Sequence, residues 1–175
     1  MKGVVLNCAA DLVTSKFGAD KWKEILSECG LPAERVFLAS DDVEDAKAVE
    51  ILSNTAKVLG LTMQQVADAF GDYWVNDFAP KIYAHFYRKA TDARSFLLNM
   101  AEVHEKTTKS MANARPPKFE YSWPEPDTLA MKYISHRGLI DVFVGLLKGV
   151  SHYYKEPMEV TKVSDDMVHI RFIKQ

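Results

Sequence analysis

His104 is the side chain of this sequence whose surroundings most favour chemistry. With a helical period over residues 92–111, Phe96, Met100 and Val103 fall on one apolar arc, and His104 lies in the middle of it. A lone histidine on an apolar face is most simply a core residue bonded to a backbone carbonyl. The alternative is a metal ligand. A zinc centre would need three or four protein ligands, and no second His, Cys, Asp or Glu follows on that arc. Haem needs only one imidazole and an apolar slot, because the porphyrin supplies four nitrogens.

A second stretch, "MKYISHRGL" at residues 131–139, combines apolar and polar side chains. If it is a β-strand, Tyr133, Ser135 and Arg137 share one face with Leu129 and Met131. Two hydroxyl donors and a forked cation after an apolar face suit an apolar disc that carries carboxylates at its edge, as haem carries its propionates. A strand end that enters solvent would give the same pattern, so the pattern is informative only beside His104.

The elements that must position these residues are predicted from periodicity and capping signals. The first two thirds of the chain are predicted to be helical, because cap residues and glycines bracket amphipathic segments. The predicted helices cover residues 3–17, 21–29 after an Asp20 cap, 43–59 after an Asp41 cap, 63–78 after Thr62, and 92–111. Pro80 is expected to end or restart the fourth helix, and the "ARPP" segment to end the fifth.

The last third changes character. Residues 118–123 and 128–137 flank "PEPD" as a hairpin, residues 139–154 form a buried helix, and residues 158–163 and 167–174 form a second hairpin. The prediction is an α+β fold with a helical N-terminal lobe, a four-stranded antiparallel sheet and one long helix. We expect a single domain, with residues 1–60 as an N-terminal subdomain and 61–175 as the part that carries the site.

Composition excludes several classes of partner. With a formal net charge of -2 and scattered basic residues, the chain has no electrostatic footprint for nucleic acid or an anionic membrane. There is no apolar run of about 18 residues and no signal peptide, so we expect a cytoplasmic protein without direct membrane insertion. Cys8 and Cys29 have no zinc-ligand spacing and are expected to be small buried hydrophobes.

Taken together, these motifs resemble the haem nitric oxide/oxygen-binding (H-NOX) family in its bacterial form, which is related to the sensor domain of soluble guanylate cyclase. The resemblance rests on "EVHEKTTKSMANARPPKFEY" followed by "YISHRGL", and extends from "MKGVV" through "AFGDYWV" to "GLLKGV". It implies haem b as the cofactor, His104 as the proximal iron ligand, and Tyr133, Ser135 and Arg137 as the residues that bind the propionates. It also implies that Pro117 presses on the porphyrin and distorts it.

On the gas-binding side, the resemblance implies apolar contacts from Val5 and Leu146, and distal-helix positions at Trp74 and Phe78. The oxygen-binding branch of the family has a distal tyrosine at the position that matches Val142. Valine donates no hydrogen bond, whereas bound oxygen is held better by a donor. We therefore expect binding of nitric oxide and carbon monoxide and little stable oxygen binding. Tyr73 or Trp74 could supply a donor instead, although an aromatic core is the simpler interpretation.

The resemblance further implies a sensor that catalyses nothing. Nitric oxide is expected to weaken the bond from iron to His104, so that the helix of His104 shifts and a partner responds. That partner is expected to be a histidine kinase, a cyclic-dinucleotide enzyme or a fused chemoreceptor. Three alternatives remain: an oxygen-binding sensor, an interaction module without haem, and an enzyme with His104 as acid or base. The last lacks a carboxylate that would orient the histidine.

Overall fold

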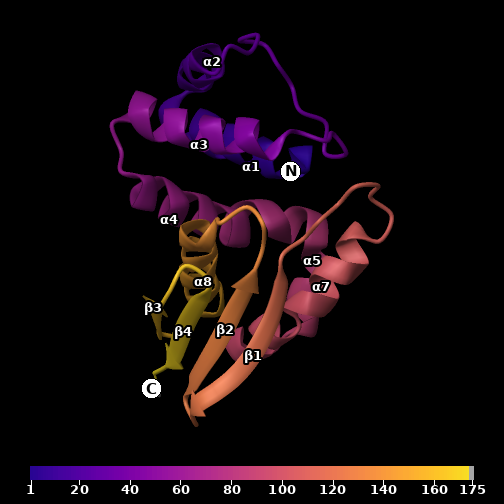
Figure 1. Ribbon diagram of the computed structural model, residues 1–175, viewed down its shortest axis with the longest axis vertical. Coiled ribbons are helices and arrows are strands. Elements are labelled where there is room, and N and C mark those ends of the chain that lie inside the picture. Colours follow the sequence, from indigo (N-terminus) through magenta and orange to yellow (C-terminus); the bar gives the residue numbers. More distant parts are fainter. Residues whose placement is uncertain (174–175) are drawn as a thin grey trace. The chain divides into compact units, whose positions relative to one another are not determined.

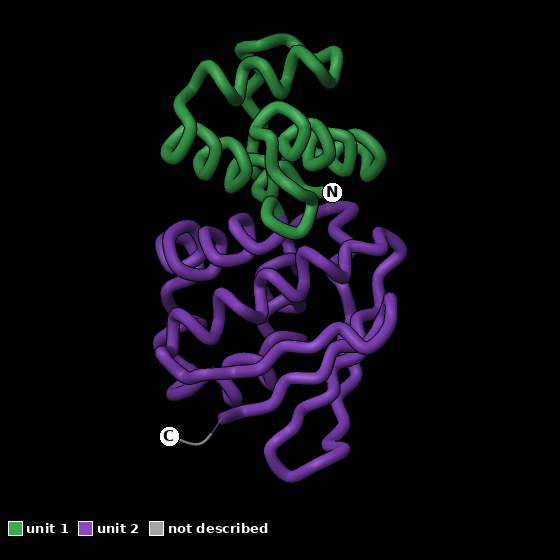
Figure 2. The backbone as a smooth tube through the Cα atoms, turned by 90° about the vertical axis from the view of Figure 1, so that its left-hand side faces the viewer, with its two compact units in different colours: residues 1–66 green, residues 67–175 purple. Residues whose placement is uncertain are grey.

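The computed structural model of the chain describes residues 1–173 and has an α+β architecture, which confirms the predicted fold class (Figure 1). Helices occupy the first two thirds, and an antiparallel sheet with one long helix follows. The chain divides into two compact units, Met1–Val66 and Ala67–Gln175, which Figure 2 colours separately.

The first unit consists of helices around its own apolar core. Its helices are α1 (Gly3–Phe17), α2 (Ala19–Glu28) and α3 (Asp45–Leu59), and α4 (Met63–Tyr73) begins in it. Leu6, Ile25, Leu26 and Ile51 are almost completely buried. Cys8 and Cys29 are buried in this core, which confirms the prediction that they are small buried residues.

Two of the predicted helix caps are wrong. Asp20 lies inside the first turn of α2, and Gly18 precedes the helix instead. The carboxylate of Asp41 accepts a hydrogen bond from the amide of Leu38 at 3.0 Å, so it closes a local turn, and α3 begins only after Glu44. Thr62 does cap α4, because its hydroxyl accepts from the amide of Gln65 at 3.1 Å and the Gln65 side chain returns the bond.

In the second unit the predicted fourth helix changes its winding. A π-helix, η1 (Trp74–Phe78), follows α4 directly, and α5 (Ala79–Lys89) follows η1. Pro80 lies in the first turn of α5, so it restarts the helix, which was one of the two expected outcomes. The side chain of Asn76 donates to the carbonyl of Asp72 at 3.0 Å and to that of Gly149 at 3.1 Å. It thereby supplies hydrogen bonds to carbonyls beside the altered turn.

The predicted helix over residues 92–111 is two helices, α6 (Ala93–Leu98) and α7 (Met100–Thr108), which meet at Asn99. The predicted start near Asp92 is confirmed, and Asp92 caps α6 through a reciprocal arrangement in which each of Asp92 and Ser95 accepts, on its side chain, a hydrogen bond from the backbone amide of the other. The last turn predicted, up to Met111, is not helical.

The sheet has the strand order β1-β2-β4-β3, and all its neighbours are antiparallel. Its strands are β1 (Lys118–Glu125), β2 (Thr128–Ile134), β3 (Met158–Lys162) and β4 (Met167–Phe172). Both predicted hairpins are present, but β2 ends at Ile134, before Ser135 and Arg137. Helix α8 (Ile140–Tyr154) packs on one face of this sheet, where Leu129, Met131 and Val168 are inaccessible to solvent (Figure 1).

Glycines allow α8 to cross the end of α4 with its backbone in contact. A β-carbon added to Gly149 would lie 2.7 Å from the carbonyl oxygen of Gly71. Because no real β-carbon approaches a backbone atom so closely, this crossing requires glycine. The crossing sets where α8 presents its remaining side chains.

Candidate functional site

His104 lies in α7, and one of its ring nitrogens, Nδ1, is buried in an unusual way. Its Nδ1 is the one buried side-chain nitrogen or oxygen without a hydrogen-bond partner among the residues that the structure describes. Burial lowers the pKa of this imidazole, and a smaller influence of the Pro117 backbone opposes that effect. A buried, unpartnered and neutral imidazole nitrogen is costly as a purely structural feature, and it is the form that binds a metal.

An aromatic column connects His104 to the sheet and to α8. The ring of Phe119 in β1 lies 5.5 Å from the imidazole, measured between centroids. Phe119 in turn stacks on Phe143 at 5.2 Å, and Phe143 stacks on Tyr133 at 5.2 Å. The column fixes the surroundings of the imidazole from two separate elements, β1 and α8.

The predicted polar triad is brought together, although not by a continuous strand. Tyr133 is buried in β2, whereas Ser135 and Arg137 lie in the turn after it and are half-buried. Burial raises the pKa of Tyr133, while a hydrogen bond with the side chain of Ser135 and the nearby charge of Arg137 lower it. The amide of Arg137 also donates to the Ser135 hydroxyl at 3.3 Å. The turn therefore brings Tyr133, Ser135 and Arg137 together, which the predicted strand was expected to do by placing them on one face.

Arg137 also connects the triad to the segment that contains Pro117. Its Nη1 donates to the carbonyl oxygen of Arg115 at 2.6 Å. Pro117, two residues further on, is half-buried and contacts His104 through its backbone. The guanidinium, the proline and the imidazole are thus tied into one local arrangement.

The predicted distal residues form two pairs with helical spacing. Trp74 and Phe78 occupy the two ends of η1, and their ring centroids lie 5.6 Å apart. Val142 and Leu146, four positions apart on α8, are half-buried like the two aromatic residues. Large apolar side chains that keep part of their surface exposed in the protein alone are suited to cover an apolar cofactor.

Val5, the remaining predicted contact, is half-buried in α1 and belongs to the first unit.

Phe119, Phe143 and the carbonyl of Arg115 were not predicted as site residues. The alternation of β1 could have indicated Phe119, and the apolar arc of α8 could have indicated Phe143. A backbone carbonyl gives no signal in the sequence.

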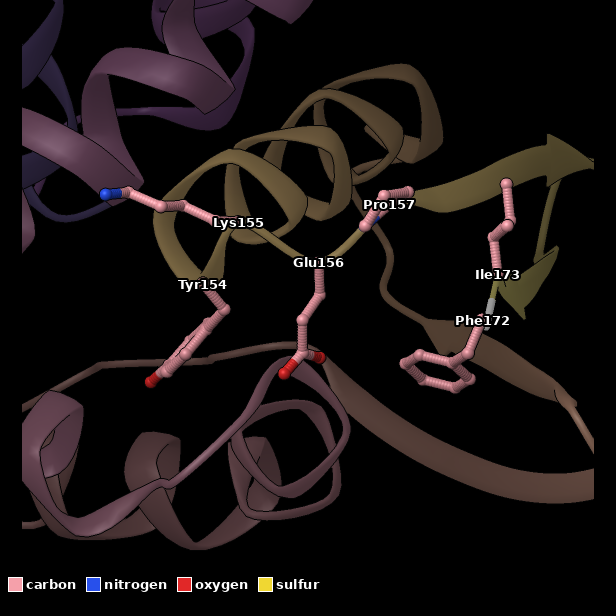
Figure 3. A pocket seen from close by; sticks show the side chains of 6 residues that line it. All are labelled: Tyr154, Lys155, Glu156, Pro157, Phe172 and Ile173. Atoms are coloured by element: carbon pink, nitrogen blue, oxygen red, sulfur yellow. The ribbon is translucent and has the colours of Figure 1, made fainter. Parts of the chain in front are cut away.

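Other places in the described residues offer less. No group of three or more His, Cys, Asp or Glu side chains could hold a metal ion there, and no helix there is long and apolar enough to cross a membrane. A pocket lies where α8 leads into β3 (Figure 3), and Glu156 extends from its wall. The Glu156 carboxylate accepts from the amide of Ala93 at 3.1 Å, so it caps α6. Its role is therefore structural.

Comparison with known proteins now gives the family. A family model described as "Haem-NO-binding" matches residues 2–162, and the chain therefore belongs to this family, the H-NOX domains. Among curated proteins, it is 24% identical over 173 residues to the soluble guanylate cyclase gcy-35 of Caenorhabditis elegans, covering 94% of this chain. It is 23% identical over 155 residues to gcy-32 of the same organism, covering 86% of this chain. These alignments cover 25% and 23% of the two relatives, so the chain spans about a quarter of their length.

Solved H-NOX structures share the fold. An oxygen-binding H-NOX domain in its oxygen complex superimposes with a TM-score of 0.84 at 24% identity, covering 99% of this chain and 96% of that one. An H-NOX protein from S. oneidensis in the Fe(II)NO state superimposes with a TM-score of 0.88 at 21% identity, covering 99% of this chain and all of that one.

Membership makes this chain a haem-based gas-sensor domain related to soluble guanylate cyclase, and H-NOX domains are sensors rather than catalysts. Haem is the cofactor of the family, in which distortion of the porphyrin has been studied structurally. The residues present fit such a group. The unpartnered Nδ1 of His104 and the grouped side chains of Tyr133, Ser135 and Arg137 are the observations that favour it.

Proposed function

We propose that this domain senses nitric oxide at a ferrous haem b whose iron is bound by His104, and that it also binds carbon monoxide. The observation that carries the proposal is the buried Nδ1 of His104 without a hydrogen-bond partner. Burying a polar atom without a hydrogen bond costs free energy, and in an interaction module without a cofactor no contact would compensate for this cost.

The chain supplies an iron ligand, side chains that can bind the haem propionates, and a residue that can contact the porphyrin face. His104 presents a neutral imidazole, because burial lowers its pKa. The hydroxyls of Tyr133 and Ser135 can donate to carboxylates, and the Arg137 guanidinium adds a charge-assisted pair of donors. We infer that Pro117 presses on one face of a porphyrin; its backbone interaction with His104, and the bond of Arg137 to a carbonyl two residues earlier, support this role. The haem itself supplies an iron that binds a diatomic gas on the side away from the histidine.

The choice of gas follows from the side chains on α8 and η1. Val142 and Leu146 donate no hydrogen bond, so they offer nothing to the partial negative charge of bound oxygen. Trp74 could donate through its indole nitrogen, but its ring lies against Phe70 at 5.9 Å and Phe78 at 5.6 Å. This stacking favours a wall of the site. Tyr73 is only 8% exposed and is assigned to the core.

Gas binding would be transmitted through α7. This helix is separated from α6 at Asn99, so it can shift without carrying the capped start of α6 with it. The proposed receiver is a signalling protein in the cytoplasm, either a histidine kinase, a cyclic-dinucleotide enzyme or a fused output domain such as a chemoreceptor. The much greater length of the nematode cyclases favours an output domain as one of these arrangements.

Absorption spectroscopy of the purified protein tests the proposal. Expressed with ample haem, the wild type should show a strong Soret band that responds to nitric oxide and carbon monoxide but not to air. His104→Ala should lose haem, and added imidazole should restore the band. His136→Ala is the matched control, because His136 is exposed in the turn after β2. A colourless wild type, or a His104→Ala spectrum identical to the wild type, would overturn the proposal.

A further inference from the structure

Helix α7, which carries His104, begins at a break for which the local sequence gives no reason. Helix α6 ends at Leu98 and α7 starts at Met100, with only Asn99 between them. Neither proline nor glycine occurs at this point, and these are the residues that usually break a helix. Asn99 is of a type favoured at helix caps, but its side chain makes no cap hydrogen bond to α7, so capping by Asn99 does not account for the break.

The hydroxyl of Tyr121 contacts both sides of the break. It donates to the carbonyl oxygen of Leu97, at 3.2 Å. The backbone of Ala101 hydrogen-bonds the same hydroxyl and opposes the rise in its pKa that burial causes, as an amide donor does. Leu97 and Ala101 are four residues apart, the spacing of one α-helical hydrogen bond. The hydroxyl thus contacts the donor and the acceptor of a single turn, and insertion of a side chain there is a recognised cause of a kink.

The sheet holds Tyr121 firmly in this place. Tyr121 lies in β1 opposite Met131 of β2, which is inaccessible to solvent. Its ring lies 6.4 Å from the ring of Phe119, two residues earlier, and Phe119 contacts the imidazole of His104. One strand therefore contacts α7 twice, at its first turn through Tyr121 and at His104 through Phe119. Figure 1 shows α7 running beside β1.

We propose that the Tyr121 hydroxyl is a positioning group for His104: by bridging Leu97 and Ala101, it keeps α6 and α7 apart and fixes the direction in which α7 leaves the break. This inference rests on the proposed function, in which His104 is the iron ligand. It adds that a residue 17 positions away in the sequence sets the geometry of that ligand through its contacts with Leu97 and Ala101.

The test compares wild type with Tyr121→Phe, which removes only the hydroxyl, as haem-loaded proteins. Resonance Raman spectra of the ferrous, gas-free proteins report the iron–histidine stretching frequency, and hydrogen exchange reports the protection of the Ala101 amide. We expect a shifted or broadened iron–histidine band, roughly fivefold lower protection at Ala101, and an unchanged haem content. Tyr154→Phe is the matched control, because that tyrosine also loses a hydroxyl bonded to a carbonyl, here that of Tyr87.

A second variant, Ala101→Pro, keeps the tyrosine and removes the amide that contacts it. Proline is tolerated in the first turn of a helix, so this variant is expected to fold and to shift the same band. An unchanged band in both variants overturns the inference, even where His104→Ala abolishes haem binding and the proposed function stands. Absence of an iron–histidine band in the wild type would instead contradict the proposed function, and the exchange at Ala101 would still decide whether Tyr121 bridges the break.

Discussion

Gly145 in α8 lies against the carbonyl oxygen of Ala67 in α4 so closely that an added β-carbon would be 2.2 Å from that oxygen. A glycine of α4 approaches α8 equally closely, since a β-carbon on Gly71 would lie 2.1 Å from the carbonyl carbon of Gly145. The two helices thus meet backbone to backbone.

Gly145→Ala should therefore destabilise the fold even though alanine favours helix. The propensity gain is about 1 kcal/mol, whereas a forced shift of two packed backbones costs about 1–3 kcal/mol or more. We expect a net loss in the free energy of unfolding, measured by urea titration. Gly71→Ala should have a similar effect, and the double variant should lose less than the sum of the two because they disturb the same contact. A Gly145→Ala protein as stable as the wild type would contradict the crossing.

Arg137→Ala should weaken haem retention. A charge-assisted hydrogen bond contributes about 1.5–3 kcal/mol, so haem should transfer to an excess of apomyoglobin about ten- to a hundredfold faster. The rate of haem transfer from Arg137→Lys should lie between those of the wild type and Arg137→Ala, because lysine keeps the charge but loses the forked geometry. Arg115→Ala is the control, since Arg115 offers Arg137 its backbone carbonyl and not its side chain. Equal transfer rates for Arg137→Ala and Arg115→Ala would argue against a role in binding propionates.

Val142→Tyr should add a hydrogen-bond donor at a position of α8 whose native side chain donates none. One such bond contributes about 1 kcal/mol or somewhat more, so oxygen affinity should rise roughly tenfold, seen as a spectral change in air-equilibrated ferrous protein. Val142→Phe introduces the ring without the hydroxyl and separates donation from bulk. If both variants responded to air alike, the hydroxyl would not be the cause.

Asp92 should make stability depend on pH in acid. Its carboxylate accepts from the amide of Ser95 at 2.6 Å, and this bond holds its pKa below the usual value. Because the folded pKa is the lower one, the contribution is fully present above the ordinary pKa of about 3.9 and is lost as pH falls through the folded pKa.

Asp92→Ala should cost about 1 kcal/mol at neutral pH as a lost helix cap. Asp92→Asn keeps an acceptor that does not titrate, so its unfolding free energy should fall less steeply below about pH 4 than that of the wild type. Asp20→Asn serves as a comparison, since Asp20 lies within a first turn and caps no helix. Parallel acid profiles for wild type and Asp92→Asn would contradict the assignment.

Sequence patterns that act over a few residues predicted the helices and strands better than the boundaries and breaks between them. The arc of His104, both hairpins and α8 follow from periodicity and turn residues, which act over a few positions. The start of α3 was placed too early, because Asp41 bonds to Leu38 and not to the helix. The break at Asn99 could not be predicted locally, because the hydroxyl that contacts Leu97 beside it belongs to Tyr121, 24 residues further along the chain. The same holds for the aromatic column, whose members come from α7, β1, β2 and α8.

The π-helix η1 has a consequence for how relatives of this protein should be aligned. A π-turn holds one residue more than an α-turn, so deleting one residue from 74–78 would restore regular winding. The extra residue is taken up within the wider turn, so a relative that lacks it can keep α5 facing as it does here, with every residue after the gap shifted by one position in the alignment. A one-residue gap in this segment of a relative would thus mark a π-turn replaced by an α-turn, with the same faces of α4 and α5 turned inward, and should not be read as the trimming of a loop.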